Sequence, residues 1–333
     1  TFNEEHLYEC RETLQNVLSD SVYNVRVCFG IYRTDNMNES LSFMCDKASF
    51  AVASIKDDTH SFIAYYDDTM LEAAIKYKTI VDEFDDAIKA GEFKMYLQPQ
   101  ISAKTRRLTG AEALVRRIKP DGTIISPIDF IPVYEKSGLI SRLDRYIWEQ
   151  AAAKLGEWKK AGINMSISVN ISPKDFYYID IFNTFAGLIK KYDIEPSNLK
   201  IEITETTIMS DVPNLMGELE ELRKAGFTLE MDDFGSGYSS LNTLKDINVD
   251  VLKVDMGFIK ETKNVKKSRI ILASVIKMAK ELNLLIITEG VETEEQVDNL
   301  TKLGCDVFQG YYFSKAIDVN EFEKRYLYRK KAG

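Results

Sequence analysis

From about residue 88 onward, short apolar runs alternate with longer amphipathic ones, and this alternation most narrowly limits the possible folds. The short runs are rich in β-branched and aromatic residues, as strands are. They cover residues 93–99, 108–117, 165–172, 199–205, 227–234, 251–258, 284–292 and 305–313. Between most of them lie helical patterns, over residues 142–161, 181–191, 213–225, 267–282 and 293–303. This order predicts the α/β fold class, as a (β/α)8 TIM-like barrel.

The first two strands depart from this alternation. Only the short segment 101–108 joins them, which is too short for a helical crossover, so we expect an antiparallel pair. A doubly wound open sheet is the alternative, but no glycine-rich phosphate turn follows the first strand. The last helix should begin with a capping box at Thr293 and Gln296. Gly226 and Gly304 should end helices in the left-handed conformation.

Residues 1–80 form a different pattern, with helices expected over 4–19 and 38–56 and strands over 23–33 and 62–67. We expect a small α/β segment, joined by a linker helix at about residues 69–91 to a barrel domain over 85–333. So short a segment buries too little apolar surface to be stable alone. It should therefore pack on upstream sequence, on the barrel or on another chain.

Composition excludes several classes of function. A net charge of −9 argues against binding a nucleic acid polymer, although a bound metal can still attract a small anionic substrate. The two histidines, His6 and His60, exclude a Ser-His-Asp triad or a histidine-rich zinc site further along. Four cysteines without ligand spacing indicate reduced thiols and a cytoplasmic protein. No apolar run reaches membrane length and no signal peptide opens the chain, which begins at Thr1, so we expect a fragment with an unseen upstream sensor or membrane segment.

Polar residues near the ends of the predicted strands are the candidate site. In such a barrel, functional groups gather at the carboxyl ends of the strands. Nearly every predicted strand supplies one there: Glu112, Asn170, Glu202, Asp232 with Asp233, Lys253, Glu289 and Gln309. One polar strand end is usually solvated, but so many oxygen donors together indicate a site.

The converging carboxylates would repel one another unless cations compensate them. Oxygen ligands without histidine or cysteine favour Mg²⁺ or Mn²⁺ over zinc. The adjacent Asp232 and Asp233 suit two ions, as in phosphodiester hydrolysis. Lys253 has apolar neighbours, so it should be buried; it could orient or deprotonate water, or offset phosphate charge. Residues 233–235 match a kinase tripeptide, but no His-Arg-Asp catalytic loop is present, which argues against a kinase.

These residues also carry a family resemblance. The segment AEALVRR at 111–117 resembles the Glu-Ala-Leu signature of EAL-domain cyclic-di-GMP phosphodiesterases. The resemblance extends over about residues 85–325 and includes, in family order, YLQPQIS, SPIDFIPVYEKSGLI, VNIS, IEITET, DDFGSGYSSL, LKVDMGFI, EGVET and QGYYFSKA. It implies metal-dependent hydrolysis of cyclic di-GMP to linear pGpG. The departures are small: Thr206 and Arg117 stand where the family often has serine and tryptophan.

The resemblance also implies roles for individual residues. Ligands of two Mg²⁺ or Mn²⁺ ions would be Glu112, Asn170, Glu202, Asp232, Asp233 and Glu289, with inhibition by Ca²⁺ expected. Lys253 would be the catalytic lysine, acting with Glu112 and Glu289. Contacts to the substrate would come from Gln98, Leu114, Arg116, Asn170, Asp255 and Gln309. A loop over 235–240, with Gly235, Ser236 and Gly237 and anchored by Glu205, would couple metal binding to a homodimer.

The N-terminal segment resembles the last part of a GGDEF domain. VRVCFGIY is similar to its late strand, and ASFAVASIK at 48–56 to its late helix, with Ser49 replacing aspartate. The signature and the nucleotide-binding half are absent, so we expect no cyclase activity. Two other functions stay open for the barrel: a cyclic-di-GMP receptor without turnover, and a scaffold that uses only its surface. Receptors of this family have usually lost ligands, whereas this chain keeps all of them.

Overall fold

The computed structural model describes residues 4–18, 26–34, 38–56, 61–210, 212–234, 244–245, 247–255 and 265–328. The chain divides into two compact units, Thr1–Phe84 and Asp85–Gly333. Each unit has a sheet of its own. Among the helices in the described ranges, none combines the length and the apolar character needed to cross a bilayer.

The N-terminal unit is a short βαβ arrangement. Its elements are α1 (Glu4–Leu18), β1 (Phe29–Ile31), α2 (Leu41–Ser54), β2 (Ile63–Tyr65) and α3 (Asp68–Asp82). β1 and β2 run parallel, and a small core of Ala51, Ile55 and Ala64 lies between them and α2. The strand expected over 23–33 is therefore shorter than predicted, and residues 23–25 lie outside the described residues.

Gly30 lets α2 pack closely on β1. A Cβ atom at Gly30 would overlap the Ala48 carbonyl oxygen and the Val52 side chain. The contact with Ala48 is to backbone, which cannot move aside as a side chain can. Glycine at this position is therefore a packing requirement of the unit.

The linker region contains two helices where the sequence predicts one. α3 ends at Asp82, and α4 (Phe84–Lys89) begins two residues later. The interruption is the single residue Glu83, whose amide still donates to the Thr79 carbonyl at 3.0 Å. Phe84 and Ala87 of α4 are buried. A pattern of apolar residues continues through such a break, so the sequence does not reveal it.

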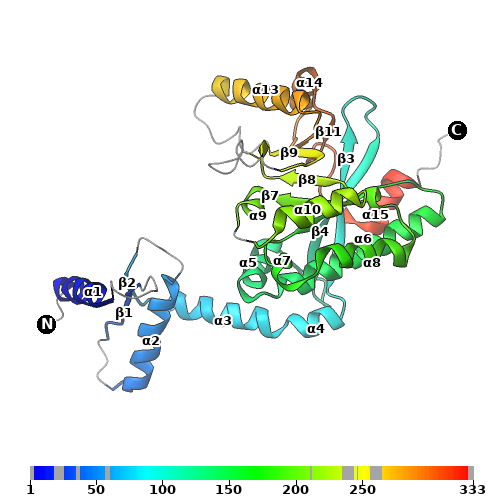
Figure 1. Cartoon of the computed structure of the whole chain (residues 1–333). Coiled ribbons are helices and arrows are strands. Elements are labelled where there is room, and N and C mark those ends of the chain that lie inside the picture. The colour runs from blue at the N-terminus through cyan, green and yellow to red at the C-terminus, as the bar shows by residue number, and fades with distance from the viewer. Residues whose placement is uncertain are drawn as a thin grey trace. The chain divides into compact units, whose positions relative to one another are not determined.

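The second unit is a closed barrel of eight strands (Figure 1). They are β3 (Phe93–Ser102), β4 (Leu108–Ile118), β6 (Ile167–Ile171), β7 (Leu199–Thr204), β8 (Leu229–Asp232), β9 (Val251–Asp255), β10 (Leu285–Glu289) and β11 (Val307–Phe308). Neighbouring strands from β4 to β11 pair in parallel. β3 runs antiparallel to both β4 and β11 and closes the ring. The predicted barrel and its reversed first strand are confirmed.

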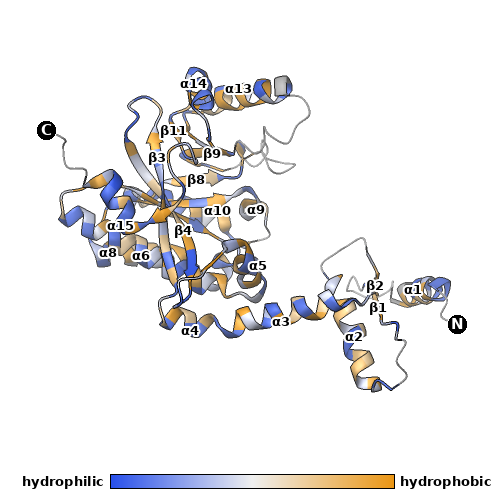
Figure 2. Ribbon diagram, turned by 180° about the vertical axis from the view of Figure 1, so that it is seen from behind, coloured by the Kyte–Doolittle hydropathy of each residue, from blue (hydrophilic) through white to orange (hydrophobic). Residues whose placement is uncertain are grey.

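Helices cover the outside of the barrel. The main ones are α5 (Pro127–Ser137), α6 (Ile140–Lys160), α8 (Ile181–Tyr192), α10 (Leu215–Lys224), α13 (Val265–Glu281) and α14 (Glu294–Leu303). Shorter elements are β5 (Ile124–Ile125), α7 (Asp175–Tyr178), η1 (Pro196–Asn198), α9 (Glu205–Ile208), β12 (Ile317–Asp318), α15 (Val319–Phe322) and η2 (Glu323–Leu327). Figure 2 shows hydrophilic and hydrophobic residues alternating along α13, as expected of a helix with one face on the sheet. The capping box at Thr293 and the left-handed Gly304 are confirmed, and Gly226 also has a positive φ.

The apolar interior of the barrel determines where its polar site lies. Val251, Ile287 and Val307 form a buried cluster on the neighbouring strands β9, β10 and β11. Side chains two residues apart in a strand share a face. The next interior positions along these three strands are therefore polar ones, at residues 253, 289 and 309. Above an apolar floor, the barrel opens into a charged layer.

Candidate active site

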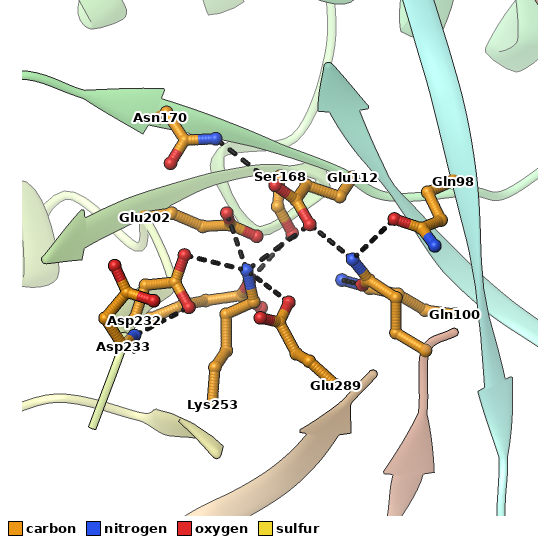
Figure 3. A network of polar contacts seen from close by, with 12 residues as sticks. Gln98, Gln100, Glu112, Ser168, Asn170, Glu202, Asp232, Asp233, Lys253 and Glu289 are labelled. Atoms are coloured by element: carbon orange, nitrogen blue, oxygen red, sulfur yellow. Dashed lines mark hydrogen bonds and ion pairs between the residues drawn. The ribbon is translucent and has the colours of Figure 1, made fainter. Parts of the chain in front are cut away.

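Lys253 is the centre of this charged layer. Its side chain is completely buried, and its ammonium Nζ lies among four carboxylates from four other strands (Figure 3). The distances are 2.8 Å to Glu289, 2.9 Å to Glu202, 3.2 Å to Asp232 and 3.4 Å to Glu112. Residues separated by up to 177 positions, as Glu112 and Glu289 are, thus meet at one point.

Four carboxylates surround one ammonium, and the excess negative charge changes how these groups bind protons. Burial and the charge of Glu112 raise the pKa of Glu202 well above its ordinary value. Burial raises the pKa of Glu289 to about 8, against the opposing effect of Lys253. Burial would lower the pKa of Lys253, but the carboxylates around it outweigh burial and raise this pKa well above its ordinary value. Lys253 is therefore an ammonium here, and the acidic cluster still lacks positive charge.

Asp233 adds a fifth carboxylate at the edge of the cluster. Its φ of 56° lies in the left-handed region, so the alternation of side chains along β8 ends at Asp232. Its amide donates to Asp232 Oδ1 at 2.8 Å, and the two carboxylates lie beside each other in Figure 3. Burial and the charge of Asp232 raise the pKa of Asp233. The left-handed residue therefore brings two adjacent acids to one side of the site.

The donor set fits a hard divalent cation. All candidate ligands supply oxygen, and Glu202 Oε1 is buried without a hydrogen-bond donor in the described part of the chain. Such an atom, within an acidic cluster that needs positive charge, suits Mg²⁺ or Mn²⁺. In the part of the chain that the structure describes, no three acidic side chains yet form a ready coordination sphere. The ammonium of Lys253 lies where their oxygens converge, which the sequence did not predict.

Amide side chains hold Glu112 in place. Gln309 Nε2 donates to Glu112 Oε2 and to Gln98 Oε1, the latter at 3.3 Å. Asn170 Nδ2 donates to the other carboxylate oxygen, Glu112 Oε1, at 3.3 Å. Gln100 supports Gln309 by donating to its Oε1 at 3.2 Å. Sequence reasoning missed Gln100, although it follows Gln98 by two residues on β3 and therefore lies on the same face.

The remaining residues that were predicted to contact a substrate line two cavities. The larger, of about 420 Å³, is lined by Gln98, Glu112, Leu114, Asp255, Glu289 and Gln309, and also by Tyr311. The smaller, of about 110 Å³, is lined by Leu114, Arg116, Asp144, Trp148 and Asn170. Arg116 is half-buried, and burial lowers the pKa of its guanidinium. Every residue predicted to contact a substrate therefore lines one of the two cavities.

The predicted loop residues have a different outcome. Glu205 is buried and begins α9 directly after β7, outside the Lys253 cluster. Gly235, Ser236 and Gly237 lie outside the described residues. The proposed coupling between this loop and metal binding stays a prediction.

Three further polar residues inside the barrel were also missed. Ser168, Lys200 and Glu230 lie on β6, β7 and β8, each two residues before a predicted ligand. Ser168 and Glu230 are completely buried, and Glu230 bonds to both of the others. The alternation of strand side chains would have found them once Asn170, Glu202 and Asp232 were placed inside.

The chain is similar to known proteins in both sequence and structure. The family model described as EAL domain matches residues 81–316. The signaling protein YkoW of Bacillus subtilis is 34% identical over 84% of this chain and 35% of its own length. The probable cyclic di-GMP phosphodiesterase PdeG of Escherichia coli is 36% identical over 74% of this chain and 48% of its own length. This chain thus spans less than half the length of either relative.

Solved structures give the same likeness. The PaMucR phosphodiesterase in complex with c-di-GMP matches with a TM-score of 0.69 and 32% identity, over 73% of this chain and 99% of that one. An EAL domain protein from Listeria monocytogenes matches with a TM-score of 0.61 and 32% identity, over 74% of this chain and 97% of that one. Both matches cover nearly the whole of the solved chains.

Proposed function

Because the chain belongs to the EAL domain family, we propose that its barrel hydrolyses cyclic di-GMP to linear pGpG. The observation that carries this proposal is the convergence of four carboxylates on Lys253 beside a cavity of about 420 Å³. Relatives at 30% and 36% identity bear the name cyclic di-GMP phosphodiesterase, and PaMucR has been solved with c-di-GMP bound. The substrate is a small dianion, which agrees with a protein of net charge −9 only if the site supplies positive charge.

Two Mg²⁺ or Mn²⁺ ions complete the proposed site. Their ligands would be Glu112, Asn170, Glu202, Asp232, Asp233 and Glu289. When bound, such ions neutralise phosphate charge and make water a stronger nucleophile. The buried, donor-free oxygen of Glu202 supports this proposal. Ca²⁺ should inhibit, because it accepts a larger and looser coordination sphere than Mg²⁺ does.

The protein's own residues bind and orient the substrate. Arg116 can present two parallel N–H groups to a phosphate, which matches the geometry of its oxygens. Gln98, Leu114, Asp255 and Gln309 line the cavity beside the acidic cluster. Lys253 is kept protonated by the surrounding carboxylates, so it is suited to orient the attacking water or offset phosphate charge. Removing a proton is the role that this arrangement favours least.

The test is incubation of the chain with cyclic di-GMP and Mg²⁺, followed by chromatography of the nucleotides. We expect pGpG from the natural sequence and none from Glu112→Ala, which removes the acid held by Gln309 and Asn170. Glu294→Ala, at an exposed position in α14, is the matched control and should stay active. Tight binding of cyclic di-GMP without product would indicate the receptor alternative. Neither binding nor product would indicate a scaffold.

We further propose that the N-terminal unit is the last part of a GGDEF domain, whose preceding half this chain does not contain. A parallel β1–β2 pair packed on α2 is the support for this assignment. No cyclase activity is expected, and incubation with GTP should yield no cyclic di-GMP. A cytoplasmic setting agrees with the four free thiols.

Homodimerisation through the barrel is a proposal that follows from the family resemblance. Sedimentation equilibrium tests it directly, because a dimer of this chain has twice the 38.0 kDa of the monomer. A single 38.0 kDa species at micromolar concentration, with and without Mg²⁺, would exclude the dimer.

A further inference from the structure

A second polar layer lies directly beneath the proposed ligands. Ser168, Lys200 and Glu230 occupy the interior of β6, β7 and β8, two residues before Asn170, Glu202 and Asp232. Glu230 is also the register partner of Glu202 across the β7–β8 pair. Two acidic side chains on neighbouring strands are therefore adjacent inside the barrel, where water does not screen them.

Both oxygens of Glu230 have partners. Lys200 Nζ donates to Oε1 at 2.8 Å, and Ser168 Oγ donates to Oε2 at 2.8 Å. Glu230 is thus the carboxylate with which Lys200 pairs.

Glu202 is satisfied on one side alone. Its Oε2 accepts from Lys253 at 2.9 Å, whereas its Oε1 is buried and has no donor among the described residues. Lys200 is on the same strand and the same face as Glu202, two residues away. A lysine has a long flexible stem and a mobile ammonium, so a released Lys200 would find the free oxygen of Glu202 within its reach.

We propose that Glu230 is a positioning residue that holds Lys200 away from Glu202 and so keeps Glu202 Oε1 available for a divalent cation. The identity of the cation as part of a hydrolytic site rests on the proposed function. A buried ion pair with no influence on the site above it is the alternative.

The experiment compares Glu230→Gln, Lys200→Met and the double variant. Mn²⁺ binding is measured by titration calorimetry without substrate, and the Mn²⁺ requirement for pGpG formation is measured separately. In Glu230→Gln, the freed Lys200 should pair with Glu202 and weaken Mn²⁺ binding by about tenfold, the usual cost of losing an outer-shell partner. The Mn²⁺ concentration that gives the half-maximal rate should therefore rise, whereas kcat at saturating Mn²⁺ should change far less.

Removing the competitor should reverse the effect. In the double variant, Lys200 is gone, so Mn²⁺ affinity should return to within about twofold of the natural chain. A purely structural role would give no such rescue. The inference is overturned if folded Glu230→Gln binds Mn²⁺ normally, if the double variant remains weak, or if the natural chain binds no divalent cation.

One outcome separates this inference from the proposed function. A natural chain that binds Mn²⁺ but forms no pGpG removes the proposed function and leaves the calorimetric test intact. Should Glu230→Gln not fold, Ser168→Ala serves instead, because it removes one of the two donors that hold Glu230. Its Mn²⁺ affinity should fall about threefold, because Glu230, held by one donor fewer, positions Lys200 less firmly and leaves it partly free to reach Glu202; an unchanged affinity would contradict the inference.

Discussion

The Lys253 ammonium lies 2.9 Å from the Glu202 carboxylate, and both side chains are completely buried. Removing one partner of such a buried pair destabilises the protein, because the other charge then remains buried without compensation. Here the ammonium also compensates three more acids, so its removal affects the whole cluster.

Lys253→Met should lower the stability of the metal-free protein by about 3 kcal/mol. Mn²⁺ should recover more of this loss in the variant than it adds to the natural chain, because the acids then depend entirely on added cations. Urea unfolding in EDTA and in Mn²⁺ measures both quantities. Lys302→Met, at an exposed position in α14, is the control and should change neither. An equal Mn²⁺ effect in both proteins would contradict the idea that lysine and metal act on the same charges.

Gln309→Leu should lower kcat/KM about tenfold, because Glu112 loses the amide that holds one of its oxygens. Gln100→Leu should have a smaller effect, since Gln100 donates to Gln309 and not to Glu112 itself among the described contacts. Steady-state assays of pGpG formation rank the two variants. An equal loss of kcat/KM in the two variants, or a larger loss in Gln100→Leu, would show that Gln309 is not the residue that positions Glu112.

Asp175 should make stability depend on pH. It is completely buried, accepts from the Ser172 amide at 2.8 Å and shares a hydrogen bond with Asp144; burial raises its pKa to about 6. A raised pKa favours the neutral acid in the folded state, so its stabilising contribution is present below about pH 4 and is lost as the pH rises through 6. Asp175→Asn keeps an acceptor but needs no proton. Its Tm, relative to the natural chain, should therefore be more favourable at pH 8 than at pH 5, by the equivalent of about 1.4 kcal/mol. Asp298→Asn, exposed in α14, should show no such difference.

Gly30→Ala should disrupt the N-terminal unit, because the added methyl group would overlap the α2 backbone at Ala48. Limited proteolysis with mass spectrometry should detect new cleavage within residues 4–82, while fragments of the barrel unit remain intact. Gly187→Ala, where a Cβ meets no atom within 4 Å, is the matched control. Cleavage that spreads equally through the barrel would show that the two units do not unfold separately.

Much of the barrel could be predicted, because the strand regions are rich in β-branched or aromatic residues and the connection between β3 and β4 is too short for a crossover. The strands β5 and β12 could not be predicted from pattern, since each has two residues and exists through pairing with β4 or β3. Glu83 separates α3 from α4, but the pattern of apolar residues does not change there, so the break could not be predicted.

The site was predictable at the strand ends and less so below them. Glu112, Glu202, Asp232 and Glu289 meet as expected, since parallel strands carry their ends to one rim. Lys200 and Glu230 were missed because charged residues in mid-strand usually point to solvent. The central position of Lys253 depends on side-chain lengths and barrel diameter, which a sequence does not display.

The reversed direction of β3 determines where the chain enters the barrel. Phe93 pairs with Arg117 near the carboxyl end of β4, and Arg117 binds Glu92 at 2.9 Å just before β3 begins. In an all-parallel barrel the first strand would start at the opposite face. Here α4 leads into β3 at the end of the barrel where β4 finishes, so the polypeptide enters the barrel from the same rim that carries the proposed ligands, with no need to cross it.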